Sequence, residues 1–171
     1  VRLLPNALDA RLRVGDTLLA LGEVQRAAEV YAVLAKHAAN AGHPLVALVA
    51  VKILEKLDPQ LGVLLDSLGA LYGRSSGRLG KAVRISQGDF SQDLPAGLSF
   101  HQTPERARLV EAAAKVAVSL EGIDAYPQVL PPIPLFSELP AEAFGPVLRA
   151  IELRRERPGE VVVQQGAMGQ S

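Results

Sequence analysis

The sequence contains no cysteine and no tryptophan, and only three of its 171 residues are histidines. Without cysteine, disulfides, thiolate chemistry and cysteine-based metal sites are excluded. Eighteen basic and eighteen acidic residues cancel to a formal net charge of zero. A neutral chain has no general electrostatic attraction to nucleic acid or to anionic lipid. We therefore expect neither nucleic acid nor a membrane as a partner.

Long hydrophobic runs and catalytic motifs are also missing. The most apolar segment, 44–57, contains three charged residues and is shorter than a membrane span of about 20 residues. The first residues lack a signal-peptide core. No P-loop, HExxH, EF-hand or dinucleotide motif occurs. The G-x-S-x-G match at 73–77 follows a predicted helix, whereas a nucleophile elbow needs a preceding strand. These absences predict a cytoplasmic protein that is not an enzyme.

Leucine and alanine, which both favour helices, dominate the 49% of residues that are hydrophobic, and aromatic residues make up only 4%. The spacing of apolar residues predicts helices over 7–21, 24–40, 44–57 and 59–72. The third is apolar on nearly every side, which is typical of a helix buried between neighbours. Short turns predict antiparallel hairpins. In the fourth helix one apolar stripe is expected to face the core: Leu61, Leu64, Leu65, Leu68, Leu71 and Tyr72.

The residues after this helical domain (1–73) predict a flexible linker over 74–102, since they are rich in Gly, Ser, Gln and Pro. Its first part is basic and contains no acidic residue. A solvated linker explains this run, and so does a contact with phosphate groups or with an acidic partner. The candidate partner-binding residues are Arg74, Arg78, Lys81 and Arg84.

The remaining segments alternate helices with proline-rich sequence. Thr103-Pro104 provides an N-cap and an N1 proline for a connecting helix within 103–122. A Pro-rich, extended connector follows over 123–133. The segment 134–171 predicts a short helix near 144–151 and a β-hairpin, with strands 152–157 and 160–164 on either side of a Pro-Gly turn.

Isolated polar residues give no metal or catalytic pattern. His37 and His43 flank Gly42 near a helix end, and we expect them to be surface or cap residues rather than metal ligands. The alternation of Arg154, Arg155 and Arg157 with two glutamates favours a solvent-facing strand over a binding patch. No catalytic, metal-binding or cofactor-binding residue is predicted.

The first two helices resemble a tetratricopeptide repeat, an interaction module of stacked helical hairpins. Small residues occur at its close-contact positions, Gly15, Gly22 and Ala27, and the large positions carry Leu18 and Tyr31. A weaker second unit includes Gly42, Ala47, Leu54 and Pro59. The sequence departs from the family at Arg11, where a large apolar residue is usual, and no proline follows near Ala39. A generic Ala-rich helical bundle is the alternative interpretation.

Residues 134–171 resemble the opening of a cyclic-nucleotide-binding domain. The resemblance rests on Pro134-Leu135-Phe136-Ser137-Glu138-Leu139-Pro140, then Phe144 and Leu148, then Glu152 to Arg157, and then Pro158-Gly159-Glu160-Val161-Val162, Gln165-Gly166 and Ser171. It implies a β-roll whose phosphate-binding Gly-Glu and Arg cassette would follow Ser171. No nucleotide-binding residue is therefore carried over to this sequence. Cyclic AMP or cyclic GMP is expected to bind only if a longer chain completes the domain. We expect such a longer chain; otherwise 161–163 must pair with a partner or a second copy.

Together these features predict a mainly α fold of antiparallel helical hairpins with a short C-terminal helix and β-hairpin. The two resemblances imply a bacterial regulatory or adaptor protein for signal transduction, which binds another protein and is controlled by a ligand. The alternative is a docking or assembly component whose cyclic-nucleotide-binding fold is degenerate and binds no nucleotide. A homo-oligomer is compatible with both interpretations.

Overall fold

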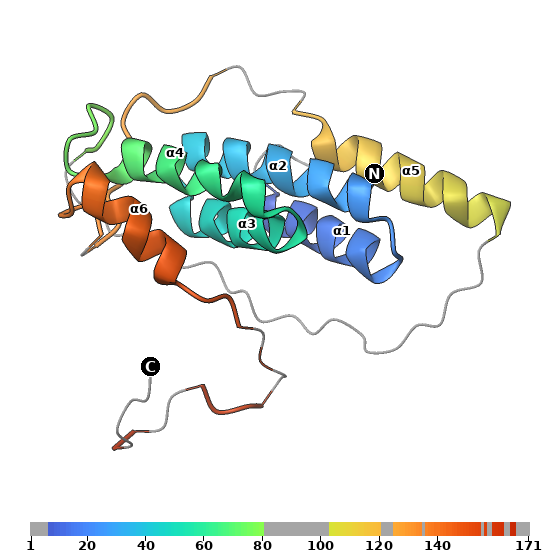
Figure 1. Cartoon of the computed structure of the whole chain (residues 1–171). Helices are drawn as coiled ribbons and strands as arrows, with labels where there is room; N and C mark the ends of the chain where they lie inside the picture. The colour runs from blue at the N-terminus through green and yellow to red at the C-terminus, as the bar shows by residue number, and fades with distance from the viewer. Residues whose placement is uncertain are drawn as a thin grey trace.

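The computed structural model describes residues 7–80, 103–120, 125–134, 136–154, 156, 159–162 and 165–166. This part of the chain is mainly helical, as predicted, and contains six α-helices and one 3-10 helix (Figure 1). The elements are α1 (Leu8–Ala20), α2 (Val24–Ala41), α3 (Pro44–Leu57), η1 (Pro59–Gly62), α4 (Val63–Tyr72), α5 (Pro104–Val118) and α6 (Ala141–Ala150). Among the described residues, we find no helix that combines the length and the hydropathy of a membrane span.

The predicted start and stop signals work through local chemistry. Gly42 ends α2 in the left-handed conformation, with a φ of 91°, which glycine adopts without steric cost. The Asp58 carboxylate accepts a hydrogen bond from the Gln60 N–H at 3.0 Å and begins η1. Thr103 Oγ1 accepts one from the Arg106 N–H at 3.4 Å and begins α5. The helix ends therefore follow from residues within one turn of each end.

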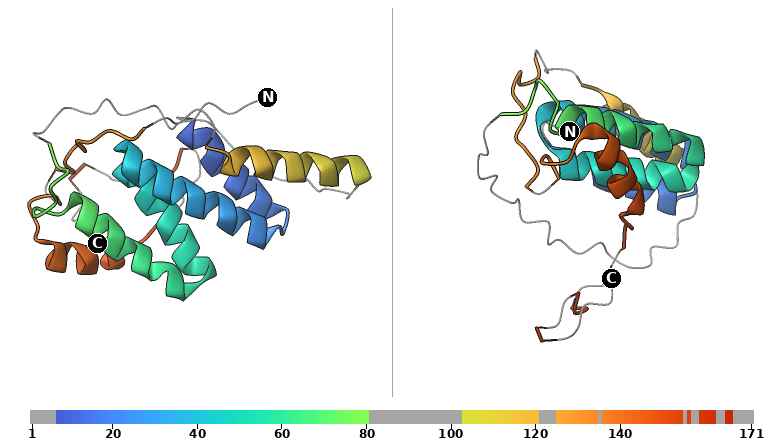
Figure 2. Two further views of the ribbon diagram at one scale, coloured as in Figure 1. Left: turned by 90° about the horizontal axis from the view of Figure 1, so that it is seen from above. Right: turned by 60° about the vertical axis from the view of Figure 1, so that its left-hand side comes forward.

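The first four helices pack against their sequence neighbours as successive hairpins, and the later helices cover the two sides of this stack. Helix α5 lies against α1 and α2, whereas α6 lies against α4 (Figures 1 and 2). The buried core is continuous from Leu8 in α1 to Leu148 in α6. Residues far apart in the sequence thus form one packed unit.

Helices α1 and α2 are in tight contact where Gly15 meets Tyr31. A Cβ atom at Gly15 would lie 2.7 Å from Cζ of the Tyr31 ring, so only glycine fits without a shift. The Tyr31 side chain is fully buried, and its hydroxyl donates to Asp16 Oδ1 at 2.6 Å. This contact requires the small and aromatic residues on which the tetratricopeptide resemblance rests; the assignment to that family stays a prediction.

Helix α6 is bound to α4 and α3 by close packing and by charged hydrogen bonds. The Arg149 guanidinium donates to both carboxylate oxygens of Asp66 at 2.6 Å. Lys52 donates to the Arg149 carbonyl oxygen at 3.1 Å and to Glu55 at 2.8 Å. Beneath these contacts the Phe144 side chain packs on Gly69, whose Cβ would meet it at 3.5 Å. The C-terminal segment is therefore anchored on the hairpin helices.

Two predictions about burial need correction. In α4 only Leu65, Leu68 and Tyr72 of the predicted stripe are buried, because α3 and α6 pack against that side, while the other three leucines are partly exposed. Helix α3 is not buried on every side, since the Leu45 side chain is 60% exposed.

The predicted β-hairpin is not confirmed. Residues 152–154, 156 and 159–162 contain no strand, and the rest of that hairpin lies outside the described residues. Val161 and Val162 are exposed, and so are Glu152 and Arg154, which form an ion pair at 3.3 Å. A two-stranded hairpin is at best marginally stable in water without further strands or a packed face, which is consistent with this result.

Candidate functional site

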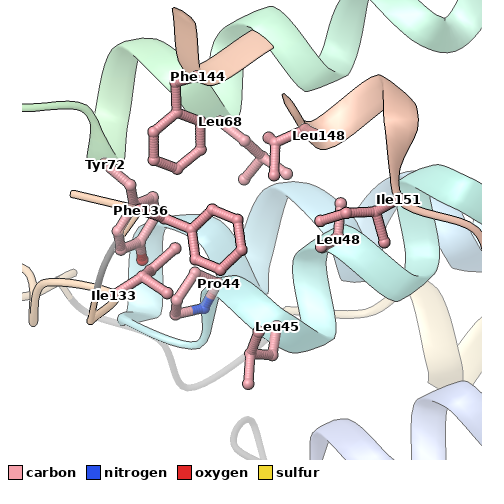
Figure 3. A pocket seen from close by; sticks show the side chains of 10 residues that line it. All are labelled: Pro44, Leu45, Leu48, Leu68, Tyr72, Ile133, Phe136, Phe144, Leu148 and Ile151. Carbon is pink, nitrogen blue, oxygen red and sulfur yellow. The ribbon is translucent and has the colours of Figure 1, made fainter. Parts of the chain in front are cut away.

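An open apolar groove of about 210 Å³ lies between α3, α4, α6 and the segment before α6 (Figure 3). Its lining side chains come from two distant parts of the sequence. The hairpin helices contribute Pro44, Leu45, Leu48, Leu68 and Tyr72, and the C-terminal segment contributes Ile133, Phe136, Phe144, Leu148 and Ile151. The groove therefore exists only where these two parts pack together.

Three side chains of the C-terminal wall, Phe136, Phe144 and Leu148, belong to the residues that resemble the cyclic-nucleotide-binding opening. Phe136 and Phe144 meet edge to face, with ring centroids 6.3 Å apart, an arrangement that aromatic pairs favour. Phe144 is fully buried, whereas Phe136 is partly exposed at the groove. Phe136 and Phe144 thus pack beside the hairpin helices, whose Leu68 and Tyr72 line the same groove.

Tyr72 is the one residue with a side-chain polar atom among those that line the groove. Its hydroxyl donates to the Ala39 carbonyl oxygen at 2.7 Å, and both atoms are buried. Burial raises the pKa of Tyr72 to about 12, and the nearby Arg78 charge acts in the opposite direction. Tyr72 is therefore neutral at physiological pH, and the groove carries no charge from its own lining.

A charged cleft of about 350 Å³ continues from the groove and shares Ile151 with it. Its other lining residues are Lys52, Glu55, Lys56, Arg149, Glu152 and Leu153. The Lys52 side chain is nearly buried, and both of its bonds are internal: one to Glu55 and one to the α6 backbone. An apolar surface and a charged surface are therefore adjacent along α3.

Of the predicted partner-binding residues, the two that the structure describes, Arg74 and Arg78, line neither the groove nor the cleft. Arg78 donates to Asn40 Oδ1 at 3.0 Å and to the Pro127 carbonyl oxygen at 2.7 Å, so its guanidinium connects α2 to the connector. Arg74 is exposed, with Nη2 3.9 Å from Glu138. Lys81 and Arg84 lie outside the described residues.

The first residues of the predicted flexible linker are connected to the rest of the chain by hydrogen bonds. The Arg74 N–H donates to the Leu139 carbonyl oxygen at 2.9 Å. Leu79 forms a parallel bridge with Leu130 of the proline-rich connector. Residues 74–80 are thus fixed by backbone contacts with distant segments, and residues 81–102 lie outside the described part.

His37 is buried, not a surface or cap residue as predicted. It is 1% exposed, its Nδ1 lies 3.3 Å from the Tyr126 hydroxyl, and the two ring centroids are 5.6 Å apart. The chain returns over α2 at Tyr126, and no local pattern around His37 could show this. His43 is exposed at the N-cap of α3, as predicted.

Arg11, the departure from the tetratricopeptide pattern, is 1% exposed and has a structural contact in place of the usual apolar one. It donates from Nη1 to the carbonyl oxygen of Ala117, at the end of α5, while its Nε has no hydrogen-bond partner among the described residues. Burial lowers the pKa of Arg11, and Tyr126 opposes this shift. Within the described ranges, no three His, Asp or Glu side chains gather as metal ligands.

Sequence reasoning missed the groove because its α3 and α4 leucines were interpreted as core, whereas Ile133 was assigned to the connector and Phe136 to the cyclic-nucleotide-binding resemblance. The available signal was helix α3, which has more apolar faces than two neighbouring helices can cover. Comparison of the chain with protein-family models, curated proteins and solved structures gives no match.

Proposed function

We propose that this chain is a non-enzymatic bacterial adaptor or regulatory protein of the cytoplasm, and that its apolar groove binds another protein. One observation supports this proposal above the others: the groove is open to solvent and lined by apolar and aromatic side chains from both halves of the chain. An open groove with apolar walls can bury the apolar side chains of a partner and so remove their surface from water.

The size of the groove favours the side chains of a protein partner over a small molecule. Pockets for small ligands measure about 300–1,000 Å³ and contain several placed polar groups. This groove measures about 210 Å³, and its single hydroxyl is already bonded to the Ala39 carbonyl oxygen. The mode of binding that fits is an amphipathic helix whose apolar residues insert between α3 and α6.

The position of α6 provides a route for ligand control. A shift of α6 relative to α3 would change the groove, because Leu148 and Ile151 form one wall while Leu45 and Leu48 form the other. A ligand that binds the two arrangements with different affinity would change the population of the open groove. In the docking alternative, α6 stays fixed and the groove is a permanent attachment point.

Titration with cyclic AMP and cyclic GMP tests whether this chain by itself contains a nucleotide site. We expect neither nucleotide to change the melting temperature of this 171-residue chain, since no phosphate-binding residue of the family pattern is matched in it. If the melting temperature rises with nucleotide concentration, a site exists in this chain and the control mechanism does not need residues after Ser171.

The groove itself is tested by Leu45→Glu. Leu45 is 60% exposed, so the substitution should leave stability within about 0.5 kcal/mol of the wild type. A display selection with a library of helix-forming 12-residue peptides provides the binding measurement. We expect peptides with apolar residues at helical spacing to bind the wild type and to lose at least about tenfold in affinity on Leu45→Glu, since a charge then faces their anchors.

Leu109→Glu is the matched control, because Leu109 is a leucine in α5 with a similar exposure of 65%, far from the groove. It should bind the selected peptides like the wild type. Equal binding of these peptides by the wild type and by Leu45→Glu would contradict the proposal that the groove is the binding site.

A further inference from the structure

The charge pattern along α3 indicates what kind of segment the groove would accept. The groove-lining residues Leu45 and Leu48 are followed on the same side of the helix by Lys52 and then Lys56 in the adjoining cleft. From Leu45 to Lys56 this stripe is about 16 Å long at the helical rise of about 1.5 Å per residue. The stripe begins with the apolar Leu45 and Leu48 and ends with the exposed Lys56, and Lys52 between them is nearly buried against α6.

Most charges of the cleft are already paired within the chain. Lys52 pairs with Glu55 at 2.8 Å, Arg149 with Asp66 at 2.6 Å, and Glu152 with Arg154 at 3.3 Å. Lys56 has no carboxylate within 4.0 Å among the described residues, and its one hydrogen bond is a long one of 3.4 Å to the Leu153 carbonyl oxygen. Its side chain is exposed. The cleft therefore presents one unpaired positive charge next to the apolar groove.

We propose that the partner is an amphipathic helix of another protein that carries apolar anchors and, about two to three turns further along, an acidic side chain that pairs with Lys56. This inference rests on the proposed function and specifies its partner. The apolar anchors fill the groove and supply most of the affinity, because they remove apolar surface from water. The acidic residue fixes the direction in which the helix lies along α3, because charge pairs at an interface select register more than affinity.

The same peptide selection, repeated on Lys56→Glu, tests this inference. On the wild type we expect enrichment of Glu or Asp at one position two to three turns from the apolar anchors. On Lys56→Glu the enrichment at that position should change to Lys or Arg. An acidic peptide selected on the wild type should bind Lys56→Glu about threefold to fivefold more weakly at low salt, as expected for an exposed ion pair. This difference should shrink at high ionic strength.

Lys115→Glu provides the matched control, because Lys115 is an exposed lysine in the last turn of α5, outside the groove and the cleft. It should leave the selected sequences unchanged. If Leu45→Glu abolishes binding while Lys56→Glu selects the same peptides as the wild type, the inference about the acidic residue is wrong and the groove proposal stands. If binding does not depend on Leu45, the groove proposal fails and this inference fails with it.

Discussion

Leu65→Asp should unfold the chain at physiological temperature. Leu65 is fully buried in α4, between α3 and α6. The substitution removes a buried leucine and places a carboxylate in an apolar site without a partner, at a cost of several kcal/mol. Because small domains are stable by only about 5–15 kcal/mol, we expect loss of most or all of the folded population. Urea denaturation followed by circular dichroism at 222 nm gives the measurement.

Leu64→Asp is the internal control for this prediction. Leu64 precedes Leu65 in α4 but is only partly buried. Its carboxylate can turn toward water, so we expect a smaller loss, with a cooperative transition still present. If the two variants have the same urea midpoint, the orientation of α4 described here is wrong. The sequence pattern alone places both leucines in one stripe and cannot rank them.

A size exchange between Gly15 and Tyr31 should be partly self-compensating. Tyr31→Ala empties a fully buried position and should cost about 3–5 kcal/mol. Gly15→Leu should also destabilise, by about 1–3 kcal/mol or more, because its Cβ atom alone would lie 2.7 Å from the tyrosine ring. In the double variant the leucine occupies space that the ring has left. We therefore expect the double variant to be more stable than Tyr31→Ala alone.

Gly15→Leu should therefore lower the free energy of unfolding in the wild type and raise it in Tyr31→Ala. A double-mutant cycle of unfolding free energies measures this change of sign. Ala20→Leu controls for the addition of a leucine to α1, since Ala20 is exposed at the end of that helix. It should change stability by less than about 0.5 kcal/mol. Additive effects of Gly15→Leu and Tyr31→Ala would show that the two residues do not meet at the helix crossing.

The helices themselves were largely predictable because their signals are local. Gly42 ends α2, Asp58 and Pro59 begin the following turn, and Thr103 with Pro104 begins α5. Each signal satisfies backbone groups within one turn of its own position. The mainly α class follows from the same periodicity. These features do not depend on how distant segments of the chain pack.

Burial was less predictable because it depends on which segments return to cover a helix. The sequence around His37 is compatible with an exposed side chain and with a buried one. The side chain is buried because Tyr126, from a distant segment, packs against it. Likewise, Arg78 was predicted to be available to a partner, but it donates to Asn40 and to the Pro127 carbonyl oxygen. These contacts span 38 to 89 residues of sequence.

The approximate boundaries of α1, α2 and α3, the scarcity of residues with catalytic or metal-binding chemistry and the glycine at the α1–α2 crossing follow from the amino-acid sequence, whereas the predicted helix over 59–72 is divided into η1 and α4. Where the apolar surface of α3 stays open follows from the packing of distant segments. The C-terminal segment covers one side of α3 through Leu148 and Ile151 but leaves Leu45 exposed. The periodicity of apolar residues shows which side chains are expected to avoid water. The groove depends instead on how far α6 extends over the apolar side chains of α3. The position of α6 is fixed by the contacts of Arg149 with Lys52 and Asp66.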